Sequence, residues 1–325
     1  GGAPDFLPGG GGVLALGIPA AAQGGESKTG GGGGAPLRRT GLLWTLWTGR
    51  SDGIGGMTNF RGACQTLVSS AVGRMLCDDI SGGLERRPVS FVNELDDQDL
   101  PYFEYTPCNV PGPGSEEREF CEAFPGCDCE PECGPLCVCI ARSGRALCPA
   151  VECSPLCRCD ETCPNRKVQH GICFRLQVFK TTAKGFGVRT LEPIARGSYV
   201  CPYAGEAIGL RTARERVRGL DPHEPNYVMA LREGGRIALV VDPSRVGGVG
   251  RFLNHSCDPN LEMVPVRAQC VVPELCLFAR RDVGPGEELT YDYSGGSDGR
   301  GGRPCLCGTP ACRGQLPLDV DVLGV

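Results

Sequence analysis

Ten of the 22 cysteines of this 325-residue chain lie within 37 residues, from Cys127 to Cys163. The rest of this stretch is rich in Pro and charged residues, and so few apolar side chains cannot hold a fold without cross-links. The chain has only 3 His, so zinc sites in it must be built from thiolates. The stretch therefore predicts a small domain that is held together through sulfur.

Nine of these cysteines are regularly spaced, and Cys148 stands apart in the gap between two groups. Each tetrahedral zinc ion takes four ligands, so nine thiolates suffice for three ions if three of the thiolates bridge two metals. Cys-x-Cys pairs suit bridging because neighbouring strand-like positions can reach different metals. The spacing predicts a three-zinc cluster with these ligands: Cys127, Cys129, Cys133, Cys137, Cys139, Cys153, Cys157, Cys159 and Cys163.

Two other arrangements of the cysteines compete with the zinc cluster. A disulfide-bonded secreted domain would be expected to follow a signal peptide, and the first residues lack its charged start and unbroken apolar stretch. An iron–sulfur cluster would favour Cys-x2-Cys-x2-Cys spacing, which is absent. Both alternatives fit the sequence less well than zinc.

Three further cysteines near the C-terminus, Cys305, Cys307 and Cys312, predict a separate metal site that lacks one ligand. The best candidate for the fourth ligand is Cys257, which lies in the polar motif Asn-His-Ser-Cys-Asp-Pro-Asn at residues 254–260. This pattern predicts a fourth zinc ion, held by four thiolates.

The formal net charge of −5 is unevenly distributed. Residues 85–132 contain 13 Asp/Glu and 3 Lys/Arg, which gives −10, so the remainder carries +5. Such a chain does not resemble a general nucleic-acid binder, and direct DNA binding is not evident. Its acidic segment suits a basic partner, such as a Lys/Arg-rich tail. The sequence contains no run of about 20 apolar residues, so it predicts no membrane-spanning helix.

Four segments differ in composition. Residues 1–84 begin with 19 Gly in the first 56 positions and are predicted to be a low-complexity, disordered N-terminal segment. Residues 85–165 form an acidic, Pro-rich arm followed by the cysteine-rich domain. Residues 166–296 show mainly β patterns, and residues 297–325 contain the last three cysteines. The predicted strands lie at 174–180, 188–191, 199–203, 237–241 and 270–279, and one helix is predicted at 211–218.

Four motifs, which follow one another along the chain, resemble the motifs of one protein family. The cysteine cluster resembles a pre-SET domain, and the terminal cysteines resemble a post-SET motif. Between them, residues 251–257 (Arg-Phe-Leu-Asn-His-Ser-Cys) and 288–293 (Glu-Leu-Thr-Tyr-Asp-Tyr) resemble the two signature motifs of the SET domain. Over roughly residues 85–325 the chain thus resembles SET-domain histone-lysine N-methyltransferases.

The resemblance implies a mainly β (α+β) fold of small curved sheets, in which the C-terminal segment threads through a loop as a pseudoknot. It implies methyl transfer from S-adenosyl-L-methionine to a lysine of histone H3, with three zinc ions in the pre-SET domain and one in the post-SET motif. The expected cofactor-binding residues are Lys184, Gly185, Phe186, Gly187, Tyr227, Arg251, Asn254 and His255. Among them, Arg251 is expected to hold the loop rather than the ligand.

The resemblance also implies three catalytic tyrosines. Tyr293 matches the tyrosine that orients the substrate amine, and Tyr203 matches a second tyrosine that lines the lysine channel. Tyr291 lies on the same strand face as Tyr293, because successive residues of a strand alternate between its two faces. A Tyr at position 291 adds a hydroxyl that can hold a water molecule in space that a more methylated amine would need, so we expect a mono- or dimethylated product.

The target lysine is not fixed by these motifs. The branch that the chain resembles most implies lysine 36 of histone H3, with lysine 4 also possible, whereas the pre-SET cluster suggests lysine 9.

Gly248 stands where the family usually has Asn, and loss of that amide is expected to weaken cofactor binding. A catalytically weak SET module that acts as a chromatin or DNA-repair scaffold is therefore the alternative function. Either protein would act in the nucleus, on the chromosome, with the histone H3 tail or the nucleosome as partner. The sequence does not fix the oligomeric state.

Overall fold

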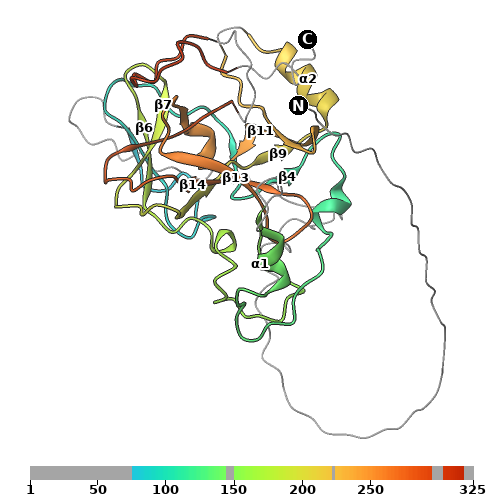
Figure 1. Cartoon of the computed structure of the whole chain (residues 1–325). Helices are drawn as coiled ribbons and strands as arrows, with labels where there is room; N and C mark the ends of the chain where they lie inside the picture. Colours follow the sequence, from blue (N-terminus) through green and yellow to red (C-terminus); the bar gives the residue numbers. More distant parts are fainter. Residues whose placement is uncertain (1–74, 144–149, 222–223, 295–302, 318–325) are drawn as a thin grey trace, which may run out of the picture. The chain divides into compact units, whose positions relative to one another are not determined.

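The computed structural model describes residues 75–143, 150–221, 224–294 and 303–317. All of them belong to one compact unit, residues 60–325 (Figure 1). Their secondary structure is mainly short β-strands, with two α-helices, and the strands form three sheets. None of the described helices is long and apolar enough to cross a membrane. The predicted mainly β fold is confirmed.

The first sheet contains the strand that delivers the signature tyrosines. Its strands, in spatial order, are β1 (Met75–Cys77), β2 (Ser90–Asn93), β6 (Leu176–Lys180), β7 (Phe186–Thr190), β15 (Glu288–Tyr291) and β12 (Asn254–His255). β15 pairs antiparallel with β7 on one side and parallel with β12 on the other. The last strand of the chain is thus inserted between two strands that precede it.

The second sheet joins the acidic arm to residues 205–247. Its main path runs β10 (Met229–Glu233), β11 (Arg236–Gly247), β9 (Gly205–Ala207) and β4 (Val110–Pro111), and β3 (Glu104–Tyr105) pairs with β11. β3 and β4 belong to the arm and pair parallel with their neighbours. The helix α2 (Leu210–Arg218) follows β9 and buries Ala213 in a small apolar cluster with Ala230 and Val240.

The third sheet joins the cysteine-rich segment to the rest of the unit. Its order is β5 (Ala150–Val151), β13 (Leu261–Arg267), β14 (Glu274–Ala279) and β8 (Tyr199–Pro202). β5 lies within the cysteine-rich segment and pairs parallel with β13. Between and beside the sheets lie α1 (Val138–Ser143) and the short 3-10 helices η1 (Glu117–Phe120), η2 (Val168–His170) and η3 (Val249–Phe252).

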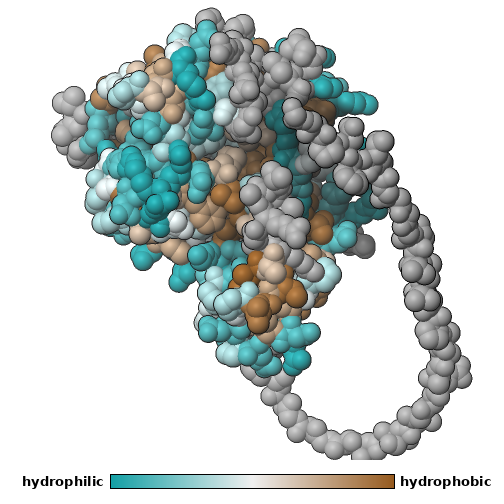
Figure 2. All heavy atoms as spheres, in the orientation of Figure 1, coloured by the Kyte–Doolittle hydropathy of each residue, from teal (hydrophilic) through white to brown (hydrophobic). Residues whose placement is uncertain are grey.

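Two kinds of core hold the unit together. The sheets surround a large apolar cluster that includes Phe91, Leu176 and Leu289, each at most 2% exposed. The cysteine-rich segment instead buries sulfur, because eight of its cysteines form their own buried cluster. Apolar side chains are left on its outside: Leu136 is 97% exposed and Leu156 61% exposed, and Figure 2 shows apolar residues on the surface around α1. This segment does not rely on an apolar core, as its composition predicts.

Several predicted boundaries differ from those of the structure. The helix begins one residue early, at Leu210, and the strand expected from residue 174 begins at Leu176. The strand expected from residue 270 begins only at Glu274, because the backbone of Val271 bonds instead to Glu122 and to the Arg267 side chain.

The expected end of the N-terminal segment at residue 84 is also too late. β1 already pairs with β2, and Cys77 and Ser81 are buried. A three-residue strand is too short to show a period in the sequence. The prediction for residues 1–74 lies outside the described residues.

Candidate active site

Three tyrosines from two distant parts of the chain meet in one place. Tyr203 follows β8, Tyr291 is the last residue of β15, and Tyr293 comes two residues later. The ring centroid of Tyr291 lies 6.0 Å from that of Tyr203 and 4.7 Å from that of Tyr293. The insertion of β15 between β7 and β12 places these rings together. The structure therefore groups the three residues that the sequence predicts to be catalytic.

The hydroxyl groups of two of these tyrosines donate to backbone carbonyls. Tyr203 Oη donates to the carbonyl of Tyr227 at 2.5 Å, and Tyr293 Oη donates to the carbonyl of Leu253 at 2.6 Å. Burial raises the pKa of Tyr203, Tyr291 and Tyr293 well above the usual value for a phenol. All three are therefore neutral near pH 7. Since the protons of Tyr203 and Tyr293 are committed to carbonyls, their oxygens remain available as hydrogen-bond acceptors.

The predicted cofactor turn lies between β6 and β7 and depends on two glycines. Gly185 has a φ of +74°, a conformation that L-residues with a side chain rarely adopt. At Gly187 there is no room for a side chain, because a Cβ there would come within 2.9 Å of Glu288 Oε1 and 3.1 Å of Asn254 Nδ2. The turn is thus shaped so that the backbone can lie against a polar cluster.

Glu288 is the centre of that polar cluster. Its carboxylate accepts from Lys184 Nζ at 2.6 Å and from Asn254 Nδ2 at 2.9 Å, and Asn254 Nδ2 also donates to the carbonyl of Phe186 at 3.0 Å. Two of the predicted cofactor residues therefore bond directly to one carboxylate, and Phe186 is joined to it through Asn254. Glu288 itself was not predicted from the sequence. The available signal was its place at the head of the motif that ends in Tyr293.

Phe186 is packed among other aromatic rings rather than standing free. Its centroid lies 5.7 Å from that of Phe91 and 6.4 Å from that of Phe252, both in edge-to-face geometry. Lys180 Nζ lies 4.9 Å from the same centroid. One part of the ring surface is thus already used by a protein cation, which the sequence did not indicate.

Arg251 is a buried cation surrounded by rings. Its guanidinium carbon lies 4.4 Å from the ring centroid of Phe103, 4.8 Å from that of Tyr227 and 5.2 Å from that of Phe252. Nη2 donates to the carbonyl of Ser244 at 3.3 Å, whereas the buried Nε and Nη1 have no acceptor among the described residues. Burial lowers the pKa of Arg251. The guanidinium is thus packed between the rings, where these two atoms have almost no surface that a ligand could reach.

The imidazole of His255 points toward the C-terminal cysteines. The backbone N–H of Tyr293 donates to Nδ1 at 3.2 Å, so Nε2 carries the proton of the neutral ring and lies 3.2 Å from Cys257 Sγ. The ring is 96% buried, and Arg313 Nη2 lies 3.4 Å from Nε2. Both ring nitrogens are engaged with protein groups. A cofactor contact at this residue would therefore come from its backbone.

The predicted metal ligands lie in two clusters. Within the cysteine-rich segment, three overlapping groups of four have their sulfur atoms within 4.8 Å of one another. These groups are Cys127, Cys133, Cys153 and Cys159; Cys127, Cys139, Cys153 and Cys157; and Cys127, Cys129, Cys133 and Cys137. Cys163, the ninth predicted ligand, is buried in the same cluster. The second cluster contains Cys257 together with the terminal cysteines Cys305, Cys307 and Cys312, as the motif spacing predicted.

The sulfur positions fit shared metal ions better than disulfide bonds. Cys139 Sγ lies 3.7 Å from Cys157 Sγ, and Cys257 Sγ lies 3.8 Å from Cys305 Sγ. A disulfide has a sulfur–sulfur distance of about 2.05 Å, whereas the edge of a tetrahedral zinc–thiolate site is about 3.8 Å for bonds of about 2.3 Å. All cysteines of the described residues are free thiols, so both clusters could hold zinc.

Gly248 has a structural explanation in the acidic arm. A Cβ at this position would lie 2.9 Å from the carbonyl oxygen of Thr106, next to β3. The loop is nevertheless fixed by hydrogen bonds, from Gly248 N to the Ala204 carbonyl at 3.1 Å and from Arg251 N to the Gly248 carbonyl at 3.3 Å. The close approach of the arm thus accounts for a residue without a side chain at this position.

These features define a class of enzyme that the comparisons with known proteins also support. Residues 185–294 match the family model of the SET domain. The protein named histone-lysine N-methyltransferase SETMAR of Rattus norvegicus is 42% identical over 280 residues, which cover 76% of this chain and 89% of that protein. The chain belongs to the SET-domain family of histone-lysine N-methyltransferases, which depend on S-adenosyl-L-methionine.

Among solved structures, the chain is similar to the methyltransferase domain of human SETMAR. That structure has a TM-score of 0.67 and 39% sequence identity, and the match covers 74% of this chain and 98% of that chain. A second similar structure is KRYPTONITE in complex with mCHH DNA, an H3(1-15) peptide and SAH, with a TM-score of 0.58 and 29% identity. That match covers 77% of this chain and 55% of that chain.

Proposed function

We propose that this protein transfers methyl groups from S-adenosyl-L-methionine to lysine 36 of histone H3 in the nucleus, with lysine 4 and lysine 9 as the other candidates. The observation that carries the proposal is the group of three neutral tyrosines, two of which keep their oxygens free to accept a hydrogen bond. The H3 peptide in the similar KRYPTONITE complex supports histone H3 as the substrate.

Tyr203 and Tyr293 would orient the attacking amine. Because each hydroxyl proton is bonded to a carbonyl, each oxygen can accept an N–H of the lysine amine and so direct the nitrogen lone pair elsewhere. The amine must be neutral to attack, and a lysine in water is charged near pH 7. Burial among these rings would lower its pKa, and so would the positive sulfonium beside it.

The residues around Glu288 and Arg251 fit the cofactor. S-adenosyl-L-methionine supplies the transferable methyl group. Arg251 would support this site indirectly, because its guanidinium packs against three rings and donates to the Ser244 carbonyl, which holds the loop that leads to Asn254. The carboxylate of Glu288 would hold Lys184 and Asn254 in place beside the turn at Gly185–Gly187.

The cysteine clusters would hold zinc in structural rather than catalytic roles. We propose three zinc ions among the nine cysteines of residues 127–163 and one ion held by Cys257 and the terminal cysteines. Four-coordinate thiolate sites leave no open position for chemistry. Cys257 follows Asn254 by three residues, so the terminal ion would fasten the loop that carries Asn254 and His255.

Tyr291 would limit the product to mono- or dimethyllysine. Its ring lies between those of Tyr203 and Tyr293, with centroids 6.0 and 4.7 Å away, and the residue is 98% buried, so its side chain lies inside the group of tyrosines that would surround the amine. A hydroxyl in this position would occupy, directly or through a bound water, space that a third methyl group needs.

The proposal is tested by incubating the purified chain with S-adenosyl-L-methionine and with H3 peptides centred on lysines 4, 9 and 36, followed by mass spectrometry. We expect the peptide with lysine 36 to be methylated fastest, and Tyr293→Phe to reduce the rate by about 100-fold or more. Calorimetry with S-adenosyl-L-methionine runs in parallel. Cofactor binding without methylation of any peptide or of nucleosomes would instead identify a scaffold.

A further inference from the structure

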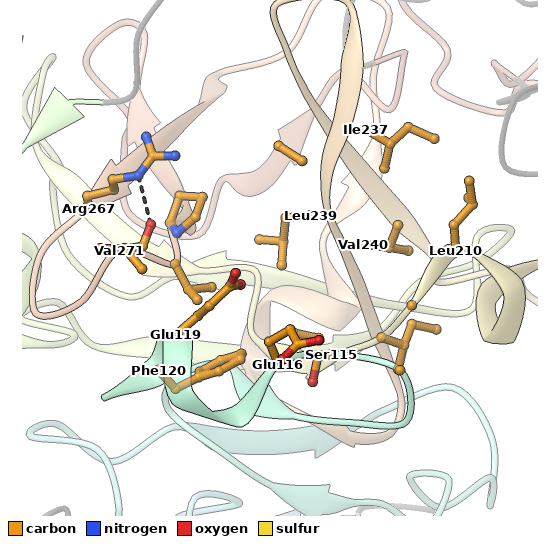
Figure 3. A pocket seen from close by; sticks show the side chains of 17 residues that line it. Ser115, Glu116, Glu119, Phe120, Leu210, Ile237, Leu239, Val240, Arg267 and Val271 are labelled. Atoms are coloured by element: carbon orange, nitrogen blue, oxygen red, sulfur yellow. Dashed lines mark hydrogen bonds between the residues drawn. The ribbon is translucent and has the colours of Figure 1, made fainter. Parts of the chain in front are cut away.

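A pocket of about 410 Å³ lies outside the tyrosine site (Figure 3). It opens between the arm at residues 114–120, the segment that leads from β9 into α2, and the first half of β11. None of the predicted catalytic, cofactor-binding or metal-binding residues lines it. Its volume lies within the range of about 300–1,000 Å³ that is typical of ligand sites.

Apolar side chains form one part of the pocket wall, beside polar groups. Phe120 comes from η1, Leu210 from the start of α2, and Leu239 from β11. Val271 closes the pocket from the loop between β13 and β14. These side chains come from four segments and point into one space (Figure 3), so they form a floor that suits a bulky apolar side chain.

The rim is acidic. Glu116 and Glu119 lie at the mouth, and both are exposed. The cation among the lining residues, Arg267, is neutralised by Glu233, whose two carboxylate oxygens lie 3.0 and 2.9 Å from its Nη2. Arg118 approaches Glu116 only at 3.7 Å, and both side chains are largely exposed, so this pair is weak. The rim therefore favours a cationic partner.

One side of the pocket is a strand with an irregular edge. In the pairing of β10 with β11, Leu231 faces Leu239 and Arg232 faces Ile237, so Ala238 is left without a partner in a β-bulge. Ala238 is exposed and lines the pocket. On its other side β11 pairs with β9 only from Val241 onward, so residues 236–239 have no strand partner there among the described residues, and such a strand edge can bind an extended peptide through its main chain.

We propose that this pocket binds an extended basic peptide, with one bulky apolar side chain on the floor and Lys or Arg residues beside Glu116 and Glu119. In an extended peptide, residues two apart lie on the same face. The matching pattern is therefore a basic residue, any residue, an apolar residue, any residue and a basic residue. Binding here does not depend on the tyrosine site, since the two share no residue, so it stands even if methyl transfer does not.

The test is fluorescence polarisation of labelled Arg-Ser-Leu-Ser-Arg with the full chain, without cofactor. We expect saturable binding that weakens on the order of three- to tenfold in the double variant E116Q/E119Q, the loss of two exposed ion pairs. The matched control Glu117→Gln, on the same 3-10 helix but outside the pocket, should change affinity less than about twofold. Ala238→Phe, which fills the mouth from an exposed position, should abolish binding.

Two further probes separate the parts of the site. Arg-Ser-Ser-Ser-Arg lacks the apolar side chain, and Glu-Ser-Leu-Ser-Glu reverses the charge; both should bind at least about tenfold more weakly. Equal binding of either probe, equal binding to E116Q/E119Q, or no binding of the first peptide overturns the proposal. A dimer of the chain that Ala238→Phe dissociates would show that a second copy occupies the pocket and would also overturn it.

Discussion

Glu274 gives the sharpest stability prediction. It is the first residue of β14, and burial, with the negative charges of Glu152 and Glu85 adding to it, raises its pKa from 4.5 to about 7. The native state therefore keeps this proton to a higher pH than the unfolded chain does. The contribution of Glu274 to the free energy of unfolding therefore falls as pH rises from 4.5 to about 7, and it stays low above that range.

The magnitude follows from the two pKa values. The full difference corresponds to about 3 kcal/mol, because each pKa unit is worth about 1.36 kcal/mol. This is an upper bound, since the side chain is only partly buried in the strand and solvent screens it. Glu274→Gln removes the titration but keeps the shape. Its advantage over the native chain should grow by at most about 1.4 kcal/mol between about pH 6 and pH 8.5.

The assay is equilibrium denaturation of the two proteins across this pH range, with zinc present and the pH kept above the region in which thiolates release metal. Glu215→Gln, at an exposed position on α2, is the matched control and should show no growing advantage. A constant free-energy difference between Glu274→Gln and the native chain at every pH would refute the argument.

Three further predictions concern the site. Tyr291→Phe should raise the methylation state of the product, and an unchanged mass spectrum of the methylated peptide would contradict the role of that hydroxyl. Glu288→Gln should weaken S-adenosyl-L-methionine binding in calorimetry by about 5- to 100-fold, because Lys184 and Asn254 lose a charged acceptor worth about 1–3 kcal/mol; unchanged affinity would remove Glu288 from the site. Cys257→Ser should lower the zinc content by one ion per chain in elemental analysis and abolish activity; full zinc content would exclude Cys257 as a ligand.

The sequence predicted what depends on spacing along the chain. The three terminal cysteines predict a metal site that needs a fourth ligand, and the structure places Cys257 beside them. The tyrosines were found because short motifs carry them, and α2 was found because glycines bound it.

What the sequence did not predict depends on contacts between distant residues. Lys180 lies over Phe186, Glu288 joins Lys184 to Asn254, and Thr106 approaches Gly248 only after the sheets have formed. The pocket beside η1 combines four segments, and no local pattern marks it. Short strands such as β1 likewise take their register from their partners rather than from a period of their own.

The position of β15 also has a consequence for how the enzyme comes into being. A ribosome makes β7 and β12 before β15, yet β15 must lie between them. Until it emerges, β7 and β12 lack this shared neighbour, and Tyr291 and Tyr293 do not yet exist. A nascent chain can therefore fold its first strands without being able to methylate anything. Catalytic competence should therefore arise late, after β15 is inserted and the terminal cysteines have joined Cys257.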